Sequence, residues 1–312
     1  MALKPRTQDL LWMIAGAATL AVVMAVVWHF RERTSPAKAV AFKATRVDVV
    51  GKMQLALARS AEAEKSAVLA TTDQDSQTFA DQAQAATAEV EHERQDLAKL
   101  LLEGGTQQER ELLDQFTRAF RDLQRVDDEV LRLAVKNTNL KAYALLFGPA
   151  SDALGQIDGA LSRLSTKASR SPDAKQVMQL AFGARTSLLR IQVQLAPHIA
   201  EESDAKMDAL EASMGREQTD AIQDLDGLAA LAPLKGDPDL AQARAAFGSY
   251  LELKKQILAL SRENTNVRSL AISLNQKRNA TVVCMDALSA LKQAILEEPI
   301  AGVTYGRPVL PR

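Results

Sequence analysis

The chain has 312 residues, of which 47% are hydrophobic but only 4% aromatic, and its formal net charge is −1. Ala, Leu and Val therefore supply most of the apolar surface. This composition suits long helices and argues against sheet sandwiches and barrels, which need aromatic, β-branched and turn residues throughout. The near-zero charge also argues against general nucleic-acid binding, which depends on a large excess of Lys and Arg.

A membrane anchor is the first predicted element and covers residues 10–30, after a short N-terminal segment, residues 1–9. No charged residue occurs from Leu10 to Trp28, and roughly 20 apolar residues of helix span a bilayer core of about 30 Å. Trp12 and Trp28 lie near the two ends of the run, where their rings favour the membrane interfaces. A cleaved signal peptide is the alternative, but its apolar region is usually shorter. We therefore predict an uncleaved anchor.

Residues 31–298 form the predicted helical body, which divides into four segments of roughly 60–65 residues, or about 90–100 Å each if unbroken. Three short breaks separate the segments: Gly104-Gly105, Ser171-Pro172 and Gly236-Asp237-Pro238. The first break is followed by Thr106 to Glu109, which has the pattern of a capping box. Helices of this length must pack side by side to bury their apolar stripes.

The body also contains a tandem repeat of two helical hairpins, about residues 40–168 and about residues 172–297. The sequence LRLAVKNTNL at residues 131–140 returns as LALSRENTNV at residues 258–267, and the register holds without a gap as far as Leu164 against Leu291. Two hairpins that each expose an apolar face bury it on one another. The simplest product is an all-α, antiparallel four-helix bundle in which the second and fourth segments lie on a diagonal.

Four asparagines form the main candidate site. Asn137 and Asn264 fall on the predicted apolar seam at equivalent places in the repeat. Asn139 and Asn266 lie two residues further on and are expected to point away from the seam. Two interpretations stay open: the amides bond each other across the core and fix the register of the helices, or they line a small polar cavity that binds a ligand.

Arg278 falls on the same seam, four residues after Leu274. Its guanidinium group either reaches the surface along its apolar stem or meets a carboxylate ligand at a subunit interface. Two other features interrupt the helical pattern. The polar stretch 71–77 is either a kinked turn or one wall of a polar pocket, and Pro197 should kink or break its helix.

Residues with recognisable enzyme chemistry are missing. The sequence has no nucleophile elbow, no Gly-rich phosphate loop and no covalent haem motif. Glu89-x-x-His92 matches half of a di-iron signature, but no second copy follows, so neither a metal site nor a cofactor is expected. Cys284, the one cysteine, lies in an apolar run and is predicted to be a core residue. The sequence therefore predicts a protein that is not an enzyme.

The stretch RSAEAEKSAVLATTD at residues 59–73 combines a Glu, a Leu-Ala-Thr segment and an acidic, polar turn. It resembles the first sensor helix of the four-helix-bundle sensor domains of bacterial methyl-accepting chemotaxis receptors. The resemblance covers residues 5–165 and extends to the second hairpin through the repeat. It implies a bundle outside the cytoplasm. The HAMP and signalling parts of such receptors have no counterpart here, and no ligand-binding residue of the family can be placed on this sequence.

These observations predict binding rather than catalysis. The leading hypothesis is a sensor-like bundle in the bacterial periplasm, anchored in the inner membrane, which forms a homodimer and binds a small molecule or a partner receptor. The candidate ligand-binding residues are Asn137, Asn139, Asn264, Asn266 and Arg278. The alternative is a structural rod that positions a partner protein near the membrane, with the extended C-terminal tail, residues 299–312, as a docking peptide.

Overall fold

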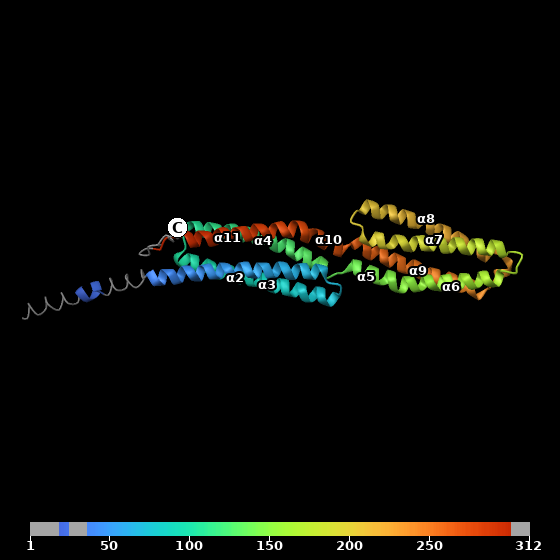
Figure 1. The fold of residues 1–312 in the computed structure, drawn as a ribbon, viewed down its shortest axis with the longest axis horizontal. Coiled ribbons are helices and arrows are strands. Elements are labelled where there is room, and N and C mark those ends of the chain that lie inside the picture. The colour runs from blue at the N-terminus through green and yellow to red at the C-terminus, as the bar shows by residue number, and fades with distance from the viewer. Residues whose placement is uncertain (1–18, 25–35, 301–312) are drawn as a thin grey trace, which may run out of the picture. The chain divides into compact units, whose positions relative to one another are not determined.

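A computed structural model describes residues 19–24 and 36–300, and every regular element within them is helical, without a β-strand. The all-α prediction is therefore confirmed for this part of the chain (Figure 1). Of the short elements, η1 and η3 are π-helical turns and η2 is a 3₁₀ turn. The elements are α2 (Pro36–Leu69), α3 (Asp73–Gly104), α4 (Gln107–Ala134), α5 (Thr138–Leu145), η1 (Leu146–Ala150), α6 (Ser151–Ala168), α7 (Ala174–Ala200), α8 (Asp204–Ala230), η2 (Ala232–Leu234), α9 (Pro238–Glu263), α10 (Thr265–Ile272), η3 (Ser273–Lys277) and α11 (Arg278–Glu297).

The predicted membrane anchor, residues 10–30, lies largely outside the described residues, as does the predicted tail, residues 299–312. Only residues 19–24 of the anchor are described, and they are helical and exposed. Among the helices that the structure describes, none combines the length and the apolar character that a membrane span requires. The anchor and the tail stay predictions.

The three predicted breaks are all present. At the first, the capping box is confirmed, because the Thr106 amide donates to the Glu109 carboxylate and the Glu109 amide donates to the Thr106 hydroxyl, each at 3.2 Å. At the third, Pro238 begins α9 and the Asp237 carboxylate caps it by accepting from the Asp239 amide at 2.7 Å. At the second, α7 begins two residues later than Pro172, with Asp173 as its N-cap.

Two further breaks correct the predicted length of the helices. Residues 70–72 divide the first segment into helices of 34 and 32 residues, and residues 201–203 divide the third into two helices of 27 residues. Local hydrogen bonds replace the helical ones at both places: the Thr72 hydroxyl accepts from the Asp75 amide at 3.0 Å, and the Glu201 carboxylate accepts from the Ser203 amide at 2.9 Å. Pro197 lies inside α7, three residues before its end, so the break follows the proline by one turn.

The chain forms two compact units. Among the described residues, unit 1 takes in those up to 59, residues 86–121 and residues 282–300, and unit 2 takes in residues 60–85 and 122–281. In unit 1, α2 is joined to α4 and to the end of α11 by buried polar contacts. Arg46, which is 2% exposed, donates to Glu109 and to Glu298 at 2.5 Å each. The Lys43 ammonium donates to the Leu296 carbonyl at 2.7 Å.

Unit 2 contains a four-helix bundle built from α6, α7, α8 and α9. Helix α6 packs on α7 and α9, and α8 packs on the same two helices. Figure 1 shows α8 beside α7 and α6 beside α9. The core includes Ile157, Leu161, Leu188, Ile191 and Tyr250, all fully buried. Helices of the second and fourth predicted segments, α6 and α9, are therefore neighbours and not diagonal. The break at residues 201–203 explains this difference, because the third segment supplies two of the four helices.

Candidate functional site

The repeated Asn-Thr-Asn sequence builds the same turn twice in unit 2. Asn137 lies between α4 and α5, Asn264 lies between α9 and α10, and both have φ 52° and ψ 39°. These are the only described residues other than glycine with positive φ. Asparagine tolerates this left-handed conformation because its short polar side chain can bond locally. We call residues 137–139 and 264–266 the crossover cluster.

Hydrogen bonds in the crossover cluster are reciprocal between the two repeats. The Thr138 amide donates to the Thr265 hydroxyl at 3.2 Å, and the Thr265 amide donates to the Thr138 hydroxyl at 3.1 Å. One residue further on, the Asn139 backbone amide donates to the side-chain Oδ1 of Asn266, and the Asn266 backbone amide donates to the side-chain Oδ1 of Asn139, both at 3.1 Å. The two copies of the motif therefore pair through an approximate twofold axis.

The side-chain amides complete this network. Asn139 donates to Asn264 at 2.7 Å and to the Ile199 carbonyl at 2.6 Å. Asn266 donates to Asn137 at 2.9 Å. Asn137 and Asn264, the two asparagines predicted to lie on the seam, are thus not bonded to each other. Each is bonded to the second asparagine of the other repeat's motif, Asn137 to Asn266 and Asn264 to Asn139.

The prediction that Asn139 and Asn266 point away from the seam is wrong. Asn139 is buried and Asn266 is partly buried, because the left-handed residue before each short helix resets the direction in which the next side chains point. The contacts support the interpretation of the asparagines as a joint between repeats that fixes their register. Their role in ligand binding stays a hypothesis.

The prediction for Arg278 is also wrong in part: the residue is exposed, and its neighbour Lys277 is buried instead. The cause is the π-helical turn η3, which ends at Lys277. A π-turn adds one residue to the helix and rotates all the following side chains. Leu274, which was placed on the buried stripe, is 55% exposed, and its neighbour Ser273 is buried.

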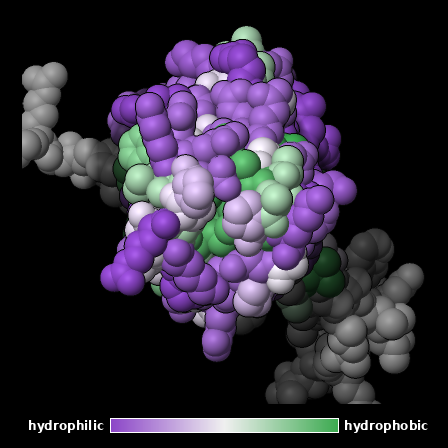
Figure 2. All heavy atoms as spheres, turned by 90° about the vertical axis from the view of Figure 1, so that its right-hand side faces the viewer, coloured by the Kyte–Doolittle hydropathy of each residue, from purple (hydrophilic) through white to green (hydrophobic). Residues whose placement is uncertain are grey.

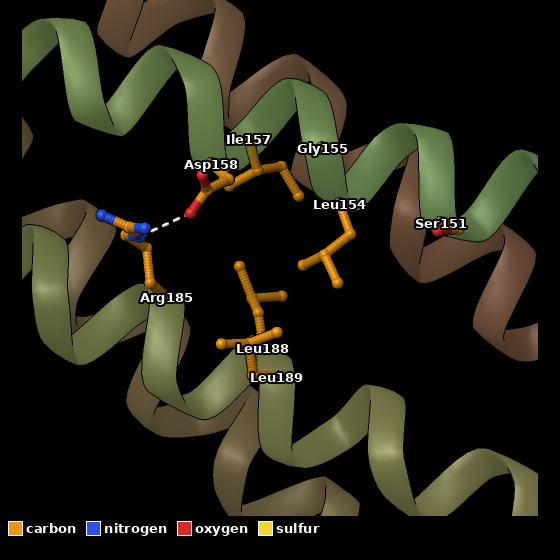
Figure 3. A pocket seen from close by; sticks show the side chains of 8 residues that line it. All are labelled: Ser151, Leu154, Gly155, Ile157, Asp158, Arg185, Leu188 and Leu189. Atoms are coloured by element: carbon orange, nitrogen blue, oxygen red, sulfur yellow. Dashed lines mark ion pairs between the residues drawn. The ribbon is translucent and has the colours of Figure 1, made fainter.

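A pocket between α6 and α7 was not predicted from the sequence. It has a volume of about 280 Å³, and its apolar wall includes Ile157 and Leu188, which are fully buried. Arg185 and Asp158 close one end with an ion pair of 2.5 Å. Figure 3 shows this pair bridging the two helices and the leucine side chains lying between them. The residues that line the pocket are Ser151, Leu154, Gly155, Ile157, Asp158, Arg185, Leu188 and Leu189.

Exposed hydrophobic side chains follow the outer face of α7 beside this pocket. Met178, Phe182, Leu189 and Val193 are 49%, 70%, 53% and 67% exposed, and they are spaced by four, seven and four residues, so they lie on one face of the helix. We call these four residues the α7 stripe. Figure 2 views the end of unit 2 where α6 passes to α7, and hydrophilic side chains cover most of that end. A cluster of exposed hydrophobic residues on one helix marks a candidate binding face.

His198, near the end of α7, lies in a buried polar contact that superficially resembles a catalytic triad. Its Nδ1 lies 2.8 Å from the Ser261 hydroxyl and its Nε2 lies 2.9 Å from the Glu211 carboxylate. Burial lowers the pKa of His198, while the Arg262 guanidinium lowers the pKa of Glu211. Ser261 is fully buried and donates to the His198 carbonyl. A buried hydroxyl that is already bonded cannot reach a substrate, so this cluster is structural.

The half-motif at Glu89 and His92 does not build a metal site within the described part of the chain. Glu89 pairs with Arg59 at 2.6 Å, and His92 lies 3.6 Å from Asp96 with its side chain largely exposed. No group of three or more potential metal-binding side chains occurs among the described residues.

Comparison with known families finds one family model that matches part of the chain. Residues 46–179, from α2 to α7, match the model of a family described as a four helix bundle sensory module for signal transduction. The match confirms the resemblance to the sensory bundles of chemotaxis receptors. It is a sensory family and not an enzyme family, which fits a function in binding. No curated protein matches the chain.

Proposed function

We propose that the chain is a membrane-anchored, extracytoplasmic sensor-like bundle that binds a small ligand or a partner at the α6–α7 face of unit 2. The observation that carries this proposal is the apolar pocket between α6 and α7, closed at one end by the pair of Asp158 and Arg185. The family match over residues 46–179 supports a sensory role. Anchoring by residues 10–30 and a periplasmic location belong to the same proposal.

The pocket defines a class of ligand. Its apolar wall suits a short aliphatic group, because binding sites for small molecules are mostly apolar with a few polar groups that fix orientation. Asp158 and Arg185 are both partly exposed, so a ligand can reach either group. A carboxylate would compete with Asp158 for the Arg185 guanidinium, and an amine would compete with Arg185 for Asp158. We therefore expect a small aliphatic carboxylate, amine or amino acid.

A partner chain would use the α7 stripe, which lies next to the pocket. The two arginines of α7 are both paired with carboxylates, Arg185 with Asp158 and Arg190 with Glu217. A second copy of α7 can thus approach without strong repulsion between unpaired charges. The proposed homodimer, or a complex with a partner receptor, buries these side chains.

Two glycine variants test the proposed pocket. Gly155 lines the pocket and Gly248 lies on α9, and a Cβ added at either position meets nothing within 4 Å. Both Gly155→Leu and Gly248→Leu should therefore fold and gain about 0.5–1 kcal/mol from better helix propensity. Only Gly155→Leu fills the pocket. The measurement is the melting temperature of the purified chain with a panel of aliphatic carboxylates, amines and amino acids, since a ligand that binds only the folded state raises it.

The melting temperature of the wild type and of the control variant, Gly248→Leu, should rise with the dose of ligand. The melting temperature of Gly155→Leu should not rise. The proposal of a ligand pocket fails if Gly155→Leu responds like the control. If the panel shifts none of the three proteins, the alternative function gains weight, in which the bundle is a structural rod that positions a partner protein. The hydrogen bonds that join the two repeats in the crossover cluster support that alternative, because a rod needs a fixed joint between its parts.

A further inference from the structure

A buried acid–base cluster in unit 2 contains more acidic than basic groups. Glu64 on α2, Asp127 on α4 and Lys277 on η3 are 0%, 4% and 2% exposed. Lys277 forms an ion pair with Asp127, so these two charges compensate each other. Glu64 remains as a second carboxyl group in the same core. The other cation that acts on it is Lys65, which is exposed on α2.

The surroundings of Glu64 disfavour the ionised form of its carboxyl group. Both of its carboxyl oxygens are buried without a hydrogen bond of good geometry, although the Ser273 hydroxyl lies close enough to act on them, and a buried ionised carboxylate without good hydrogen bonds is very costly. Burial raises the pKa of Glu64, and the charge of Asp127 raises it further, against the opposing effects of the Ser273 hydroxyl, Lys277 and Lys65. The protonated carboxyl group is neutral and avoids most of this cost.

The cluster lies at a deformable element of the helix. Ser273 and Lys277 are the first and last residues of the π-turn η3, and π-turns are rare, strained insertions that often mark functional positions. The equivalent π-turn of the other repeat, η1, ends in the buried residue Ala150. The fold can therefore build this turn without an acid–base cluster, so the cluster is specific to α2, α4 and η3.

We propose that Glu64, Asp127 and Lys277 form a proton-sensitive element, in which Glu64 holds a proton in the folded chain and releases it as η3 loosens from α2. The proton comes from water and returns to it, and the pair of Asp127 and Lys277 keeps its charges throughout. Release leaves one uncompensated negative charge in the core. A rise in pH therefore shifts the population towards an opened η3, where water can reach the carboxylate. This element is independent of the α6–α7 face.

The sign of the pH effect follows from linkage. A carboxyl group whose pKa is higher in the folded state binds its proton more tightly there than in the unfolded state. The group therefore stabilises the folded state at low pH. This stabilisation is lost as the pH rises from the pKa of the unfolded state through the pKa of the folded state. Across that window, each pH unit should lower the folding equilibrium constant by up to about tenfold because of this one group.

Chemical denaturation of the full chain from pH 5 to 9 tests the proposal. Glu64→Gln, which mimics the protonated form, should remove the pH dependence assigned to Glu64 and protect the amides of residues 273–277 at high pH relative to wild type. The matched control is Glu62→Gln, an exposed glutamate on the same helix, which should behave like wild type. Identical pH profiles for Glu64→Gln and Glu62→Gln would overturn the proposal.

A second variant keeps the test decisive if Glu64→Gln does not fold. Asp127→Asn frees Lys277 to act as the counter-ion of Glu64, which should lower the pH of the transition by roughly 1–3 units, the usual effect of a new opposite charge. Infrared spectra of the wild type should also show a protonated carboxyl band at neutral pH that disappears on the alkaline side. The proposal that Glu64 holds a proton is contradicted if Asp127→Asn leaves the pH of the transition unchanged and the wild type shows no infrared band of a protonated carboxyl group.

Discussion

Replacing Arg46 with alanine is expected to lower the free energy of unfolding by about 3–5 kcal/mol, the usual effect of removing one partner from a buried ion pair. Arg46 bonds Glu109 and Glu298 at 2.5 Å each, and Glu109 is fully buried. The truncation leaves the Glu109 carboxylate in the core without its cation. It also removes the cation that lies 4.8 Å from the centre of the Phe42 ring. Denaturant titration followed by circular dichroism measures the loss.

Arg59→Ala is the matched control for this variant. Arg59 lies on the same helix and pairs with Glu89 at 2.6 Å, but both side chains are about half exposed. Exposed pairs contribute about 1 kcal/mol or less. A loss in Arg46→Ala no larger than that in Arg59→Ala would show that the buried cluster does not hold α2 to α4.

Asn139→Ala should be the most damaging change in the crossover cluster, with an expected loss of about 3 kcal/mol or more. The side chain donates to the Ile199 carbonyl and to Asn264, and it accepts from the Asn266 amide. Each buried partner left without a hydrogen bond costs about 1–3 kcal/mol. Unfolding by denaturant again provides the measurement.

The control for Asn139→Ala is Asn275→Ala, because Asn275 is exposed and its amide bonds only the Ala271 carbonyl of the preceding turn. Surface substitutions of this kind usually change stability by about 0.5 kcal/mol or less. Equal effects of the two variants would contradict the assignment of the crossover cluster as the joint between repeats.

Local turn chemistry made the main breaks of the fold predictable. Residues close together in the sequence determine the capping box at Thr106 and the start of α9 at Asp237-Pro238. Both could therefore be located without a structure. The break at residues 201–203 follows Pro197 by one turn and was indicated only by that proline. The break at residues 70–72 appeared in the sequence as a polar stretch whose structural role stayed open.

The positions of individual side chains were harder to predict, because the seam was traced with a constant helical period. The left-handed turns at Asn137 and Asn264 and the π-turn η3 each change that period. As a result Asn139 lies inside the cluster and Lys277 takes the buried place assigned to Arg278. The repeat of Asn-Thr-Asn did identify the residues that meet, although not which of them bond.

The α6–α7 pocket depends on how two helices pack, which no local pattern specifies. One signal was nevertheless available. Helix α7 carries two apolar stripes, an inner one that includes Leu188 and Ile191 and the outer α7 stripe, whereas a helix that only packs on a core needs one. A second apolar stripe on a helix therefore indicates a binding face. A sequence analysis that follows only the buried seam does not find it.

Amide hydrogen exchange of Gly155→Leu against Gly248→Leu tests most directly whether the bundle acts as a sensor. Filling the pocket imitates an occupied site, and α6 follows α5 and Asn137 in the chain through the turn η1, which is kinked at Gly148. A sensor must pass a change at the pocket to another part of the chain, so the account predicts altered protection at residues 137–139 and 264–266 in Gly155→Leu only. Changes confined to α6 and α7, with the crossover cluster as in Gly248→Leu, would contradict a sensory role and favour the structural rod.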